Sequence, residues 1–592
     1  MCGISGMFGS PEPSIVKSMT RLQHHRGPDG KGIWNDEHIS LGHSRLAIVD
    51  LEGSPQPINS DHGCILVVNG EIYNYQKLRE SNQSYPWKTM GDSESILALH
   101  RTSTHNLELP SANDHCKWLN QLDGMFALSL WDPAKKQLIL ARDEMGIKPL
   151  LRTAINGSLL FASEAKAFHA HPQYTPEMDM QALLARLVWE YPLDATSLFQ
   201  GVHQVRPGTV EVWSIDDGIA TMKSSARFSR PMFEPTDSWD VNKGSHLLLN
   251  GFTESVGQRL MSDVPVGIVL SGGLDSSLVA AVASDAAKRY ERPTPACWTV
   301  AESEDNPDWM AAELVASSLD LEHHQSIMDS DSFSQHLPSL SWHGEDLDVS
   351  VLFFQPLFKE MSKVVRVGLC GQGADEIHAG YPRYVDLKQH QQQLESRISE
   401  LEHPFAATLQ SDSLPDDSRW WTQDHRPSTH LSSLQNTLQF EMDHGQLSNF
   451  QLRLVDRHSM AHSLEVRVPF LGRAHRQEAM KLPMSQRLPT TGLEKKALRS
   501  AAALTNLPES VVYRKKLPAG TATSPTLLTS CLNEYSSQIK EIASRWSVCG
   551  KVLRRQPEIA LGLGLFESIH LRGHGLNLHN RTLDDLLNEV IS

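Results

Sequence analysis

Residues 264–281, VPVGIVLSGGLDSSLVAA, constrain the fold of this chain more than any other stretch. An apolar run that ends at Leu270 leads into SGGLDSS, and an Ala- and Val-rich helical pattern follows. This order predicts a strand, a glycine turn and a helix. Gly272 and Gly273 let backbone N–H groups approach a phosphate closely, and the helix N-terminus adds a partial positive charge. The stretch is therefore typical of a phosphate-binding loop.

Asp275 distinguishes this turn from a Walker loop, because no Lys follows the glycines and an acid stands where phosphate would be repelled. An acid fits there beside a cation, so we interpret Asp275 as a ligand of the Mg²⁺ that accompanies ATP. The alternative is a tight turn in which Asp275 caps the helix. SGGLDSS resembles the pyrophosphate loop of the ATP pyrophosphatase family, whose members cleave ATP between the α and β phosphates and adenylate a substrate. This resemblance favours the ATP site.

The length and charge of the chain narrow the classes of function. Its 592 residues leave room for several domains of about 150 residues each. The net charge of −16 argues against a nucleic-acid or anionic-membrane surface. No apolar run approaches ~20 residues, and the first residues lack a basic start and an apolar core, so we expect neither a transmembrane helix nor a signal peptide. Seven Cys without a CxxC pair predict free thiols in a reducing cytoplasm.

Short strand signals dominate the first half of the chain. Turn residues such as Asp132-Pro133 and Asn156-Gly157 join many of them, which favours antiparallel pairing. Helical patterns occur at 93–101 and near 76–80. We therefore expect a layered α+β domain over residues 1–215. The strand signals lie at 64–68, 125–131, 137–141, 158–162 and 209–213.

Cys2 is the most informative residue of this domain. Removal of Met1 would expose a thiol and a free α-amine on one residue, and an α-amine with a pKa of about 8 can act as general base for its own side chain. The alternative, a small buried thiol, is the commoner outcome for an isolated Met-Cys start. Motifs further along the chain favour the nucleophile.

These motifs carry groups suited to binding a free amino acid. Asn69 and Gly70 follow a strand, where a side-chain amide and a backbone N–H can form an oxyanion hole. Asp92 opens a helix with a carboxylate that can meet a substrate ammonium, and Arg45 can pair with a substrate carboxylate. Both ends of an amino acid can therefore be clamped.

MCGISG, HHRGPDG, GHSRLAIVD, VNGEIYNY and MGDSESILAL together resemble the class II glutamine amidotransferase domain, an N-terminal-nucleophile hydrolase. The resemblance implies that Cys2 is the nucleophile and that Asn69 and Gly70 form the oxyanion hole. No departure occurs at these positions, so an intact glutaminase is expected. The glutamine-binding residues that the resemblance implies are Arg45, Glu71 and Asp92.

The second half alternates strands and helices, with strand signals at 294–300 and 364–369 and a helix at 308–319. This alternation indicates a parallel α/β sheet covered on both faces, with ligands at the carboxyl ends of its strands. The strand at 364–369 runs into CGQGADE, a second glycine turn with acids. Two such turns on neighbouring strands can hold one Mg²⁺ between Asp275 and Asp375, although Asp375 alone would fit a helix cap.

VDRHSMAHSLEVRVPFL and GLEKKALR, further along, add to the resemblance. With the two glycine turns they resemble the synthetase domain of glutamine-hydrolysing asparagine synthetase. This implies that Lys495 is the cation that stabilises the leaving phosphates and the adenylate, although a solvated helix lysine is the commoner fate. Gln372 stands where the family commonly has an acid, and Gly472 where it commonly has Asp. The implied ATP-binding residues are Val269, Leu270, Ser271, Gly272, Gly273, Asp275, Ser276, Val300, Gly371 and Gln372.

The predicted domains are a glutaminase at 1–215, an irregular linker at 216–240, an ATP-dependent synthetase at 241–525 and a helical tail of unassigned role at 526–592. The polar stretch 388–437 is expected to be an insertion or a loose helical excursion. The synthetase domain is expected to be an α/β parallel-sheet adenylating domain with additional helices.

The predicted function is that of an amide-forming ligase. Glutamine supplies ammonia, and ATP with Mg²⁺ activates a carboxylate as an acyl-adenylate. The resemblance makes aspartate the expected acceptor, with a sugar acid or a secondary metabolite as the alternative. A non-catalytic nucleotide-binding scaffold and a glutamine-independent ligase are the rivals, and the intact Cys2 argues against the latter. No nucleic acid or membrane is expected as a partner, and a homodimer is left open.

Overall fold

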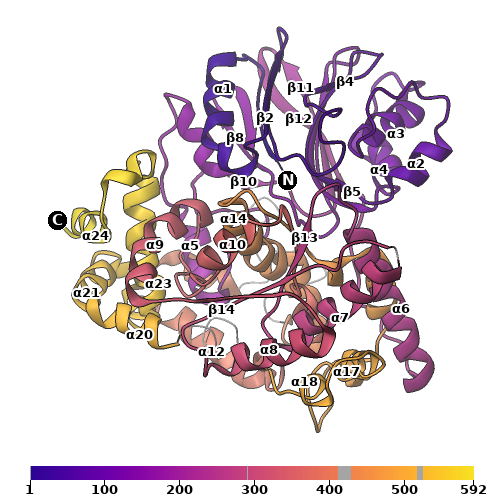
Figure 1. Ribbon diagram of the computed structural model, residues 1–592. Helices are drawn as coiled ribbons and strands as arrows, with labels where there is room; N and C mark the ends of the chain where they lie inside the picture. The colour runs from indigo at the N-terminus through magenta and orange to yellow at the C-terminus, as the bar shows by residue number, and fades with distance from the viewer. Residues whose placement is uncertain (1, 290, 411–428, 517–524) are drawn as a thin grey trace.

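The computed structural model describes residues 2–289, 291–410, 429–516 and 525–592 (Figure 1). Its N-terminal part contains two six-stranded antiparallel sheets, with the strand orders β10-β8-β9-β1-β3-β2 and β12-β11-β7-β6-β5-β4. The first sheet comprises β1 (Gly3–Phe8), β2 (Gly30–Asn35), β3 (Ile39–Arg45), β8 (Leu151–Ile155), β9 (Ser158–Ala162) and β10 (His203–Gln204). The second comprises β4 (Ile58–Asn59), β5 (Ile65–Ile72), β6 (Gly124–Asp132), β7 (Gln137–Arg142), β11 (Thr209–Asp216) and β12 (Ile219–Arg227).

The two sheets bury their facing surfaces against each other, and helices cover their outer surfaces. Alternate residues of each strand point inward, so Phe8 and Leu41 of one sheet share a core with Val67 of the other. The helices α1 (Pro13–Leu22) and α5 (Met180–Trp189) pack on the first sheet, and α3 (Glu94–Thr104) and α4 (Ala112–Leu119) pack on the second. This four-layer arrangement agrees with the predicted layered α+β domain.

All five predicted strands of this part are present as β5, β6, β7, β9 and β11, and the predicted helices correspond to α3 and α2 (Tyr75–Ser81). The prediction of an irregular linker at 216–240 is wrong in part. Within it, β12 pairs with β11 along its whole length and forms the edge of the second sheet. Its sequence, IATMKSSAR, carries no apolar alternation because an edge strand with solvated side chains needs none.

The C-terminal part is built on a five-stranded parallel sheet, as predicted, with the order β15-β14-β13-β16-β17. Helices cover both of its faces, among them α6, α7 and α8 on one face and α9, α10 and α14 on the other. The strands are β13 (Val266–Val269), β14 (Cys297–Ala301), β15 (His323–Ile327), β16 (Val367–Leu369) and β17 (Glu465–Arg467). The helices are α6 (Val241–Arg259), α7 (Leu274–Arg289), α8 (Pro307–Leu319), α9 (Ser330–Gly344), α10 (Phe354–Ser362) and α14 (Leu452–Met460).

The register of this sheet brings the two glycine turns together. Ile268 of β13 pairs with Leu369 of β16, so both strands end at the same edge of the sheet. The turn after β13 leads into α7, and the turn after β16 leads into the short helix α11 (Ala374–His378). Because carboxyl ends of parallel strands form the usual ligand-binding edge, the two turns meet where the sequence predicts a nucleotide.

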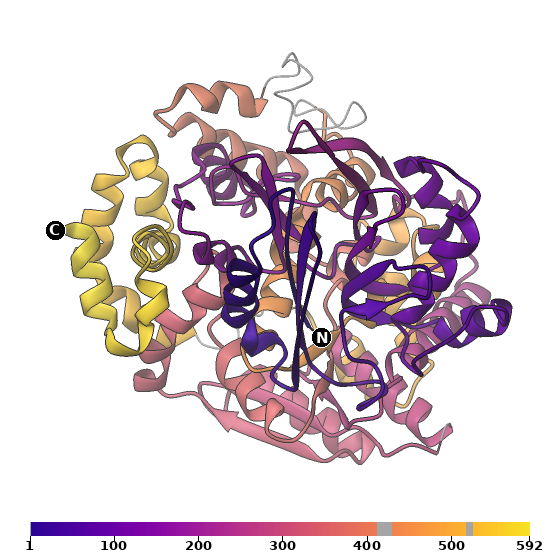
Figure 2. The same ribbon diagram turned by 90° about the horizontal axis from the view of Figure 1, so that it is seen from above.

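The tail is helical, as predicted, and forms one side of the molecule (Figure 2). It consists of α20 (Pro525–Glu534), α21 (Ser536–Arg545), α22 (Gly550–Arg555), α23 (Pro557–Phe566) and α24 (Leu583–Ile591). These helices join α5 and α9 in one apolar cluster, in which the ring of Phe566 lies 5.0 Å from that of Phe199 between centroids. The tail therefore contacts both the N-terminal and the C-terminal part.

The polar stretch 388–437 is partly helical where it is described. Helix α12 (Leu387–Ser399) and the 3₁₀ segment Pro404–Gln410 begin it, residues 411–428 lie outside the described part, and α13 (Leu434–His444) follows. Among the described helices, none combines the length and apolar character needed to cross a membrane.

Candidate active sites

The first site forms around Cys2, which directly precedes the central strand β1. The backbone nitrogen of Cys2 donates to Asn69 Oδ1 at 3.0 Å, although 67 positions separate the two residues. The other side-chain atom of Asn69, Nδ2, is buried without a hydrogen-bond partner among the described residues. Burial raises the pKa of the Cys2 thiol. An amide donor left unpaired beside a thiol is suited to an oxyanion.

Gly70 follows Asn69 on β5, and the neighbouring strand explains why a glycine is needed there. A Cβ added to Gly70 would lie 2.0 Å from the carbonyl oxygen of Met125 on β6. Any side chain would push the two strands apart, so Gly70 allows the close pairing that holds Asn69 beside Cys2.

Glu71 and Asp92, the predicted glutamine-binding acids, lie close together. Asp92 Oδ2 accepts a hydrogen bond from the backbone N–H of Ile72 at 2.7 Å, which fixes it next to Glu71. Burial raises the pKa of both carboxyl groups, that of Asp92 to about 6, and charge repulsion from Asp92 and Glu465 adds to the rise at Glu71. Buried carboxylates with raised pKa values are suited to receiving a cation such as a substrate ammonium.

Arg45, the third predicted glutamine-binding residue, points at its own loop. Its guanidinium donates to the carbonyl oxygens of Asp50 at 2.6 Å and Leu51 at 2.7 Å. The same loop is pinned by the Asp50 carboxylate, which accepts from Ser54 Oγ at 2.5 Å and from the backbone N–H of Met90 at 3.0 Å. Arg45 therefore holds the loop after β3, and Asp50 of that loop contacts the segment that carries Asp92.

Arg26 is a positioning residue that the sequence did not single out beyond its turn motif. Its Nε donates to the carbonyl oxygen of Cys2 at 3.0 Å, and its Nη1 pairs with Glu164 at 2.8 Å and with Asp456 at 2.9 Å. The side chain is fully buried. Arg26 thus holds the carbonyl group of Cys2, while Asn69 holds its nitrogen, and Arg26 links Cys2 to α14 of the C-terminal part.

Arg467 brings a charge from the C-terminal part to the same site. Its Nε pairs with Glu465 Oε1 at 2.6 Å, and its Nη2 lies 3.8 Å from Glu71 Oε1. The motif EVR in β17 therefore ends beside the predicted glutamine-binding acid. The first site is completed by residues from both halves of the chain.

The second site is a cavity of about 170 Å³ at the carboxyl ends of β13 and β16. Of the predicted ATP-binding residues, Leu270, Gly272 and Val300 do not line it, and the roles of all ten stay predictions. Gly272 instead has φ +67, and a Cβ there would lie 2.4 Å from Ala312 N, so it fixes the turn rather than the cavity wall. The predicted residues that line the cavity are Val269, Ser271, Gly273, Asp275, Ser276, Gly371 and Gln372.

Lys495 lies between the two predicted metal ligands. Its Nζ is 2.5 Å from Asp275 Oδ2 and 2.5 Å from Asp375 Oδ1, and Lys516 Nζ is 2.5 Å from Asp375 Oδ2. Burial would raise the pKa of Asp375, but the two ammonium groups outweigh it and hold that pKa well below its ordinary value. Lys495 itself is 2% exposed, which contradicts the reading of a solvated helix lysine.

The two carboxylates also fit a Mg²⁺ ion. Asp275 Oδ1 is buried and has no hydrogen-bond partner among the described residues, which leaves a hard oxygen donor available at the cavity. Two carboxylates combined with phosphate oxygens are the usual donor set for Mg²⁺ in ATP sites. Asp275 and Asp375 would hold the ion.

Gly380 and Arg514 also shape this site, although neither lies in a recognisable local motif. A Cβ at Gly380 would lie 1.9 Å from Asp375 Oδ1 and 2.1 Å from Lys495 Cε, so only glycine leaves room for the pair. Arg514 donates to the carbonyl oxygen of Gly272 at 3.2 Å and to Asp308 Oδ1 at 2.8 Å. The contact of Gly380 with Lys495 and both contacts of Arg514 join segments far apart in the sequence, and no short motif records them.

Comparisons with known proteins find a matching family for each half of the chain. Residues 1–224 match the family model of the glutamine amidotransferase domain, and residues 248–546 match that of asparagine synthase. Glutamine-hydrolyzing asparagine synthetases 1 and 3 of Bacillus subtilis are 30% and 27% identical, covering 87% and 88% of this chain and 86% of each relative. Asparagine synthetase B of Escherichia coli is 31% identical, covering 64% of this chain and 65% of that protein. The chain belongs to the glutamine-hydrolysing asparagine synthetase family.

Within the asparagine synthetase family, the two departures of this chain have different surroundings. Gln372 lines the cavity at the ends of β13 and β16, and its Nε2 donates to Gln451 Oε1 at 2.6 Å. Gly472 lies outside that lining and is the N-cap of α15 (Arg473–Ala479). A Cβ at Gly472 would lie 1.9 Å from Ser255 Oγ and 2.7 Å from Arg259 Nη1. The missing side chain at Gly472 therefore leaves room for α6. Of the two departures, only Gln372 is placed to affect a ligand.

Proposed function

We propose that this asparagine synthetase family member hydrolyses glutamine at Cys2 and passes the ammonia to a carboxylate, activated as an acyl-adenylate, in the C-terminal part. The expected acceptor is aspartate, and the expected products are asparagine, glutamate, AMP and pyrophosphate. A carboxylate needs this activation because it lacks a leaving group, which the adenylate provides. The proposal rests on one observation above all: the Cys2–Asn69 contact and the Lys495 contact with Asp275 and Asp375 occur in the same chain.

In the glutaminase half, the thiol of Cys2 attacks the side-chain amide carbon of glutamine. The nitrogen that lies on Asn69 Oδ1 becomes the α-amine once Met1 is removed, and it takes the thiol proton and delivers it to the departing ammonia. Asn69 Nδ2 and the Gly70 N–H stabilise the oxyanion, and water then releases glutamate from the thioester. Arg45, Glu71 and Asp92 are the proposed glutamine-binding residues.

In the synthetase half, the family uses ATP, and the turns at 271–276 and 371–372 are the proposed phosphate-binding segments. Bound Mg²⁺ would neutralise phosphate charge between Asp275 and Asp375. Lys495 contributes a fixed positive charge where negative charge develops on the leaving pyrophosphate. A scaffold without activity would have no need for this buried lysine, held between two carboxylates.

The test is a product assay. Protein freed of Met1 is supplied with ATP, Mg²⁺, glutamine and aspartate, and asparagine, glutamate and pyrophosphate are measured together. We expect the three products to appear in nearly equal amounts. Glutamate formed without asparagine or pyrophosphate would refute aspartate as acceptor, and the absence of all three would refute the proposed enzyme.

Gln372 favours a second candidate, an acceptor other than aspartate. An amide can orient the acceptor but cannot take the proton that leaves the attacking nitrogen. Glu376 is an ionisable group nearby, with a pKa raised to about 7 by burial and by the charge of Asp375, and it accepts a hydrogen bond from Tyr381 at 2.6 Å. Aspartate as acceptor would therefore need another proton acceptor, such as Glu376, whereas a site that Gln372 adapts to a different acid is the second candidate.

ATP/pyrophosphate exchange with a panel of carboxylates decides between the acceptors. Exchange that depends on aspartate and is equally fast in Gln372→Glu would exclude the second candidate. Exchange with another acid, lost in Gln372→Glu, would establish it.

A further inference from the structure

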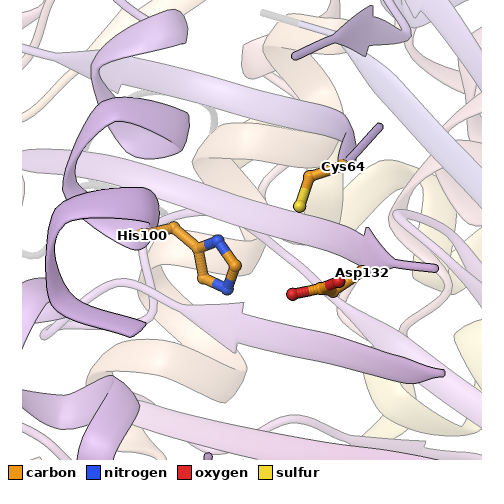
Figure 3. Close-up of side chains that lie close together, drawn as sticks. All are labelled: Cys64, His100 and Asp132. Carbon is orange, nitrogen blue, oxygen red and sulfur yellow. The ribbon is translucent and has the colours of Figure 1, made fainter. Parts of the chain in front are cut away.

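Three side chains that the proposed function does not use converge at the far end of β5: Cys64, His100 and Asp132 (Figure 3). Cys64 directly precedes β5, and Asp132 ends β6. Because Ile65 pairs with Trp131, the two residues lie opposite each other across the strand pair. His100 reaches the same place from α3. One ligand atom from each residue lies within 4.8 Å of the others, and the side chains are 7%, 3% and 4% exposed.

The surroundings orient two of these groups as a metal site requires. Asp132 Oδ1 accepts hydrogen bonds from the backbone N–H groups of Ala134 at 3.1 Å and Lys135 at 3.3 Å, which leaves Oδ2 for the cluster. Thr104 donates its hydroxyl proton to the carbonyl oxygen of His100 at 2.7 Å, so its oxygen can accept from His100 Nε2 at 3.3 Å. This contact is compatible with the tautomer that has its proton on Nε2 and a lone pair on Nδ1.

The imidazole of His100 is also held in place as a ring. His115 stacks on it with centroids 5.6 Å apart and an interplanar angle of 6°. His115 is itself fixed, because its Nδ1 accepts from Trp118 Nε1 at 3.1 Å. Hydrogen bonds and stacking that fix a ligand ring are characteristic of metal-binding histidines.

The donor set indicates which ion fits. A thiolate, an imidazole and a carboxylate together match Zn²⁺ and similar divalent transition metals, and they exclude Mg²⁺ and Ca²⁺, which take oxygen donors. A tetrahedral zinc ion spaces its ligand atoms about 3.4 Å apart, so these side chains would close in by about 1.4 Å at most. Without a metal, burial and the charge of Asp132 raise the pKa of the Cys64 thiol to about 12, and metal binding would displace that proton.

A cavity of about 290 Å³ adjoins the three side chains and leaves room for a fourth ligand. His62 also lines this cavity, as does Lys135. Lys135 is a competing charge, because its Nζ lies 4.0 Å from Asp132 Oδ2, but it also donates to the carbonyl oxygen of Thr104 at 2.7 Å. The Cys64 thiolate and the Asp132 carboxylate together balance the two positive charges of the ion. Lys135 keeps its hydrogen bond to the carbonyl oxygen of Thr104.

We propose that Cys64, His100 and Asp132 bind a zinc-class divalent metal ion, with water or His62 in the fourth position. The five residue-to-residue steps from Cys64 to Asn69 span about 17 Å, so the ion would lie well away from the glutaminase chemistry. It would tie α3, which follows Asp92, to the ends of β5 and β6. The site is structural and independent of the proposed function.

Co²⁺ alone is the first probe, because a thiolate ligand gives it charge-transfer absorption in the near ultraviolet. Cys2 could chelate cobalt through its thiol and amine, so the titration uses Cys2→Ala as the parent protein. We expect one equivalent of Co²⁺ to produce the absorption, Cys64→Ser to abolish it, and Cys116→Ser, a thiol on nearby α4, to keep it. Absence of the band in the parent, or its survival in Cys64→Ser, would overturn the proposal.

Zn²⁺ with thermal unfolding is the second probe, and it does not depend on the thiol spectrum. We expect Zn²⁺ to raise the unfolding temperature of the parent by several degrees, and to have no effect on the folded His100→Gln and Asp132→Asn variants. Circular dichroism without metal shows whether these variants are folded. An equal rise in parent and variants would mean that zinc binds elsewhere and would refute the three-residue site.

Discussion

The side chain of Asn69 serves two purposes with its two polar atoms. Its oxygen accepts from the backbone nitrogen of Cys2, and its nitrogen stays unpaired in a buried position. A buried donor without a partner is costly in a resting protein, of the order of 1–3 kcal/mol. In the proposed glutaminase that cost would be recovered when an oxyanion forms beside Asn69, so the arrangement would favour the transition state over the empty site.

Cys2→Ala tests whether glutamine hydrolysis and amide formation occur at two separate sites. The variant should lose glutamine-supported product by about 1,000-fold or more, because the nucleophile is gone. The rate of synthesis from ammonium salts should stay within about twofold of the parent rate, since Cys2 does not line the cavity of the second site. Amide formation is measured with each nitrogen source on correctly processed protein. An equal loss with both sources, in a folded variant, would contradict two separate sites.

The raised pKa of Asp92 predicts a pH dependence of glutamine binding. Its carboxyl group is charged above a pKa of about 6 and neutral below it. If the charge pairs with the substrate ammonium, the KM for glutamine should rise as the pH falls through 6, approaching about tenfold per pH unit. Initial rates of glutamate release between pH 5 and 8 give this profile.

Asp92→Asn is the matched variant for this profile. It should have a high KM throughout and lack the inflection near pH 6, although Glu71 remains. An inflection that persists unchanged in Asp92→Asn would assign the titration to another group.

At the scale of elements, local sequence patterns predicted where most of the strands and helices around the second site lie. SGGLDSS and CGQGADE each encode a strand end, a turn and a helix start within a few residues, so β13, α7, β16 and α11 could be predicted from short stretches. β12 could not, because an edge strand with solvated side chains lacks the apolar alternation that identifies a strand. Arg26 and Gly380 were missed for another reason: Asp456 and Lys495, which they contact, are distant in sequence, and only the fold brings them together.

Gly70→Ala tests how the pairing of β5 with β6 supports the glutaminase site. The added Cβ meets the carbonyl oxygen of Met125, so the strands must separate. We expect a loss of stability of about 2 kcal/mol and the loss of most glutaminase activity. Thermal unfolding and glutamate release measure the two effects.

Gly30→Ala on β2 is the stability control, because its Cβ would meet only Arg45 Cβ at an ordinary 3.6 Å. Equal stability of Gly70→Ala and Gly30→Ala would show that the strand contact is more tolerant than this spacing implies.

At the scale of the whole molecule, buried ion pairs join the two halves. Asp456 on α14 lies 2.9 Å from Arg26 Nη1 and 3.6 Å from Lys148 Nζ, both in the N-terminal part. Glu345 and Lys166 form a second such pair at 3.3 Å. These residues belong to separate parts of the sequence. Taken one at a time, such charged residues are expected at the protein surface. Only the assembled fold shows that they are buried partners.

Asp456→Asn should weaken this junction. It removes the carboxylate that Arg26 and Lys148 share, although Arg26 keeps its pair with Glu164, so we expect a cost of about 1–3 kcal/mol. Because Arg26 also holds Cys2, we expect a lower unfolding temperature and more glutamate released per amide formed. Thermal unfolding and the ratio of the two products measure these effects.

Asp216→Asn, which removes an exposed ion pair with Lys223, is the control and should change stability by less than about 0.5 kcal/mol. Identical behaviour of the two variants would show that the buried pairs do not couple the halves.

The contact between Phe199 and Phe566 sets an order of events during synthesis. Phe199 leaves the ribosome long before Phe566, and at usual elongation rates the interval is roughly half a minute. Throughout that interval the apolar face of the nascent first domain has no tail to cover it, so it is open to chaperones and to other nascent chains. A recombinant fragment that stops before α20 would carry this exposed face permanently, and for this reason the N-terminal part is better produced within the full chain than alone.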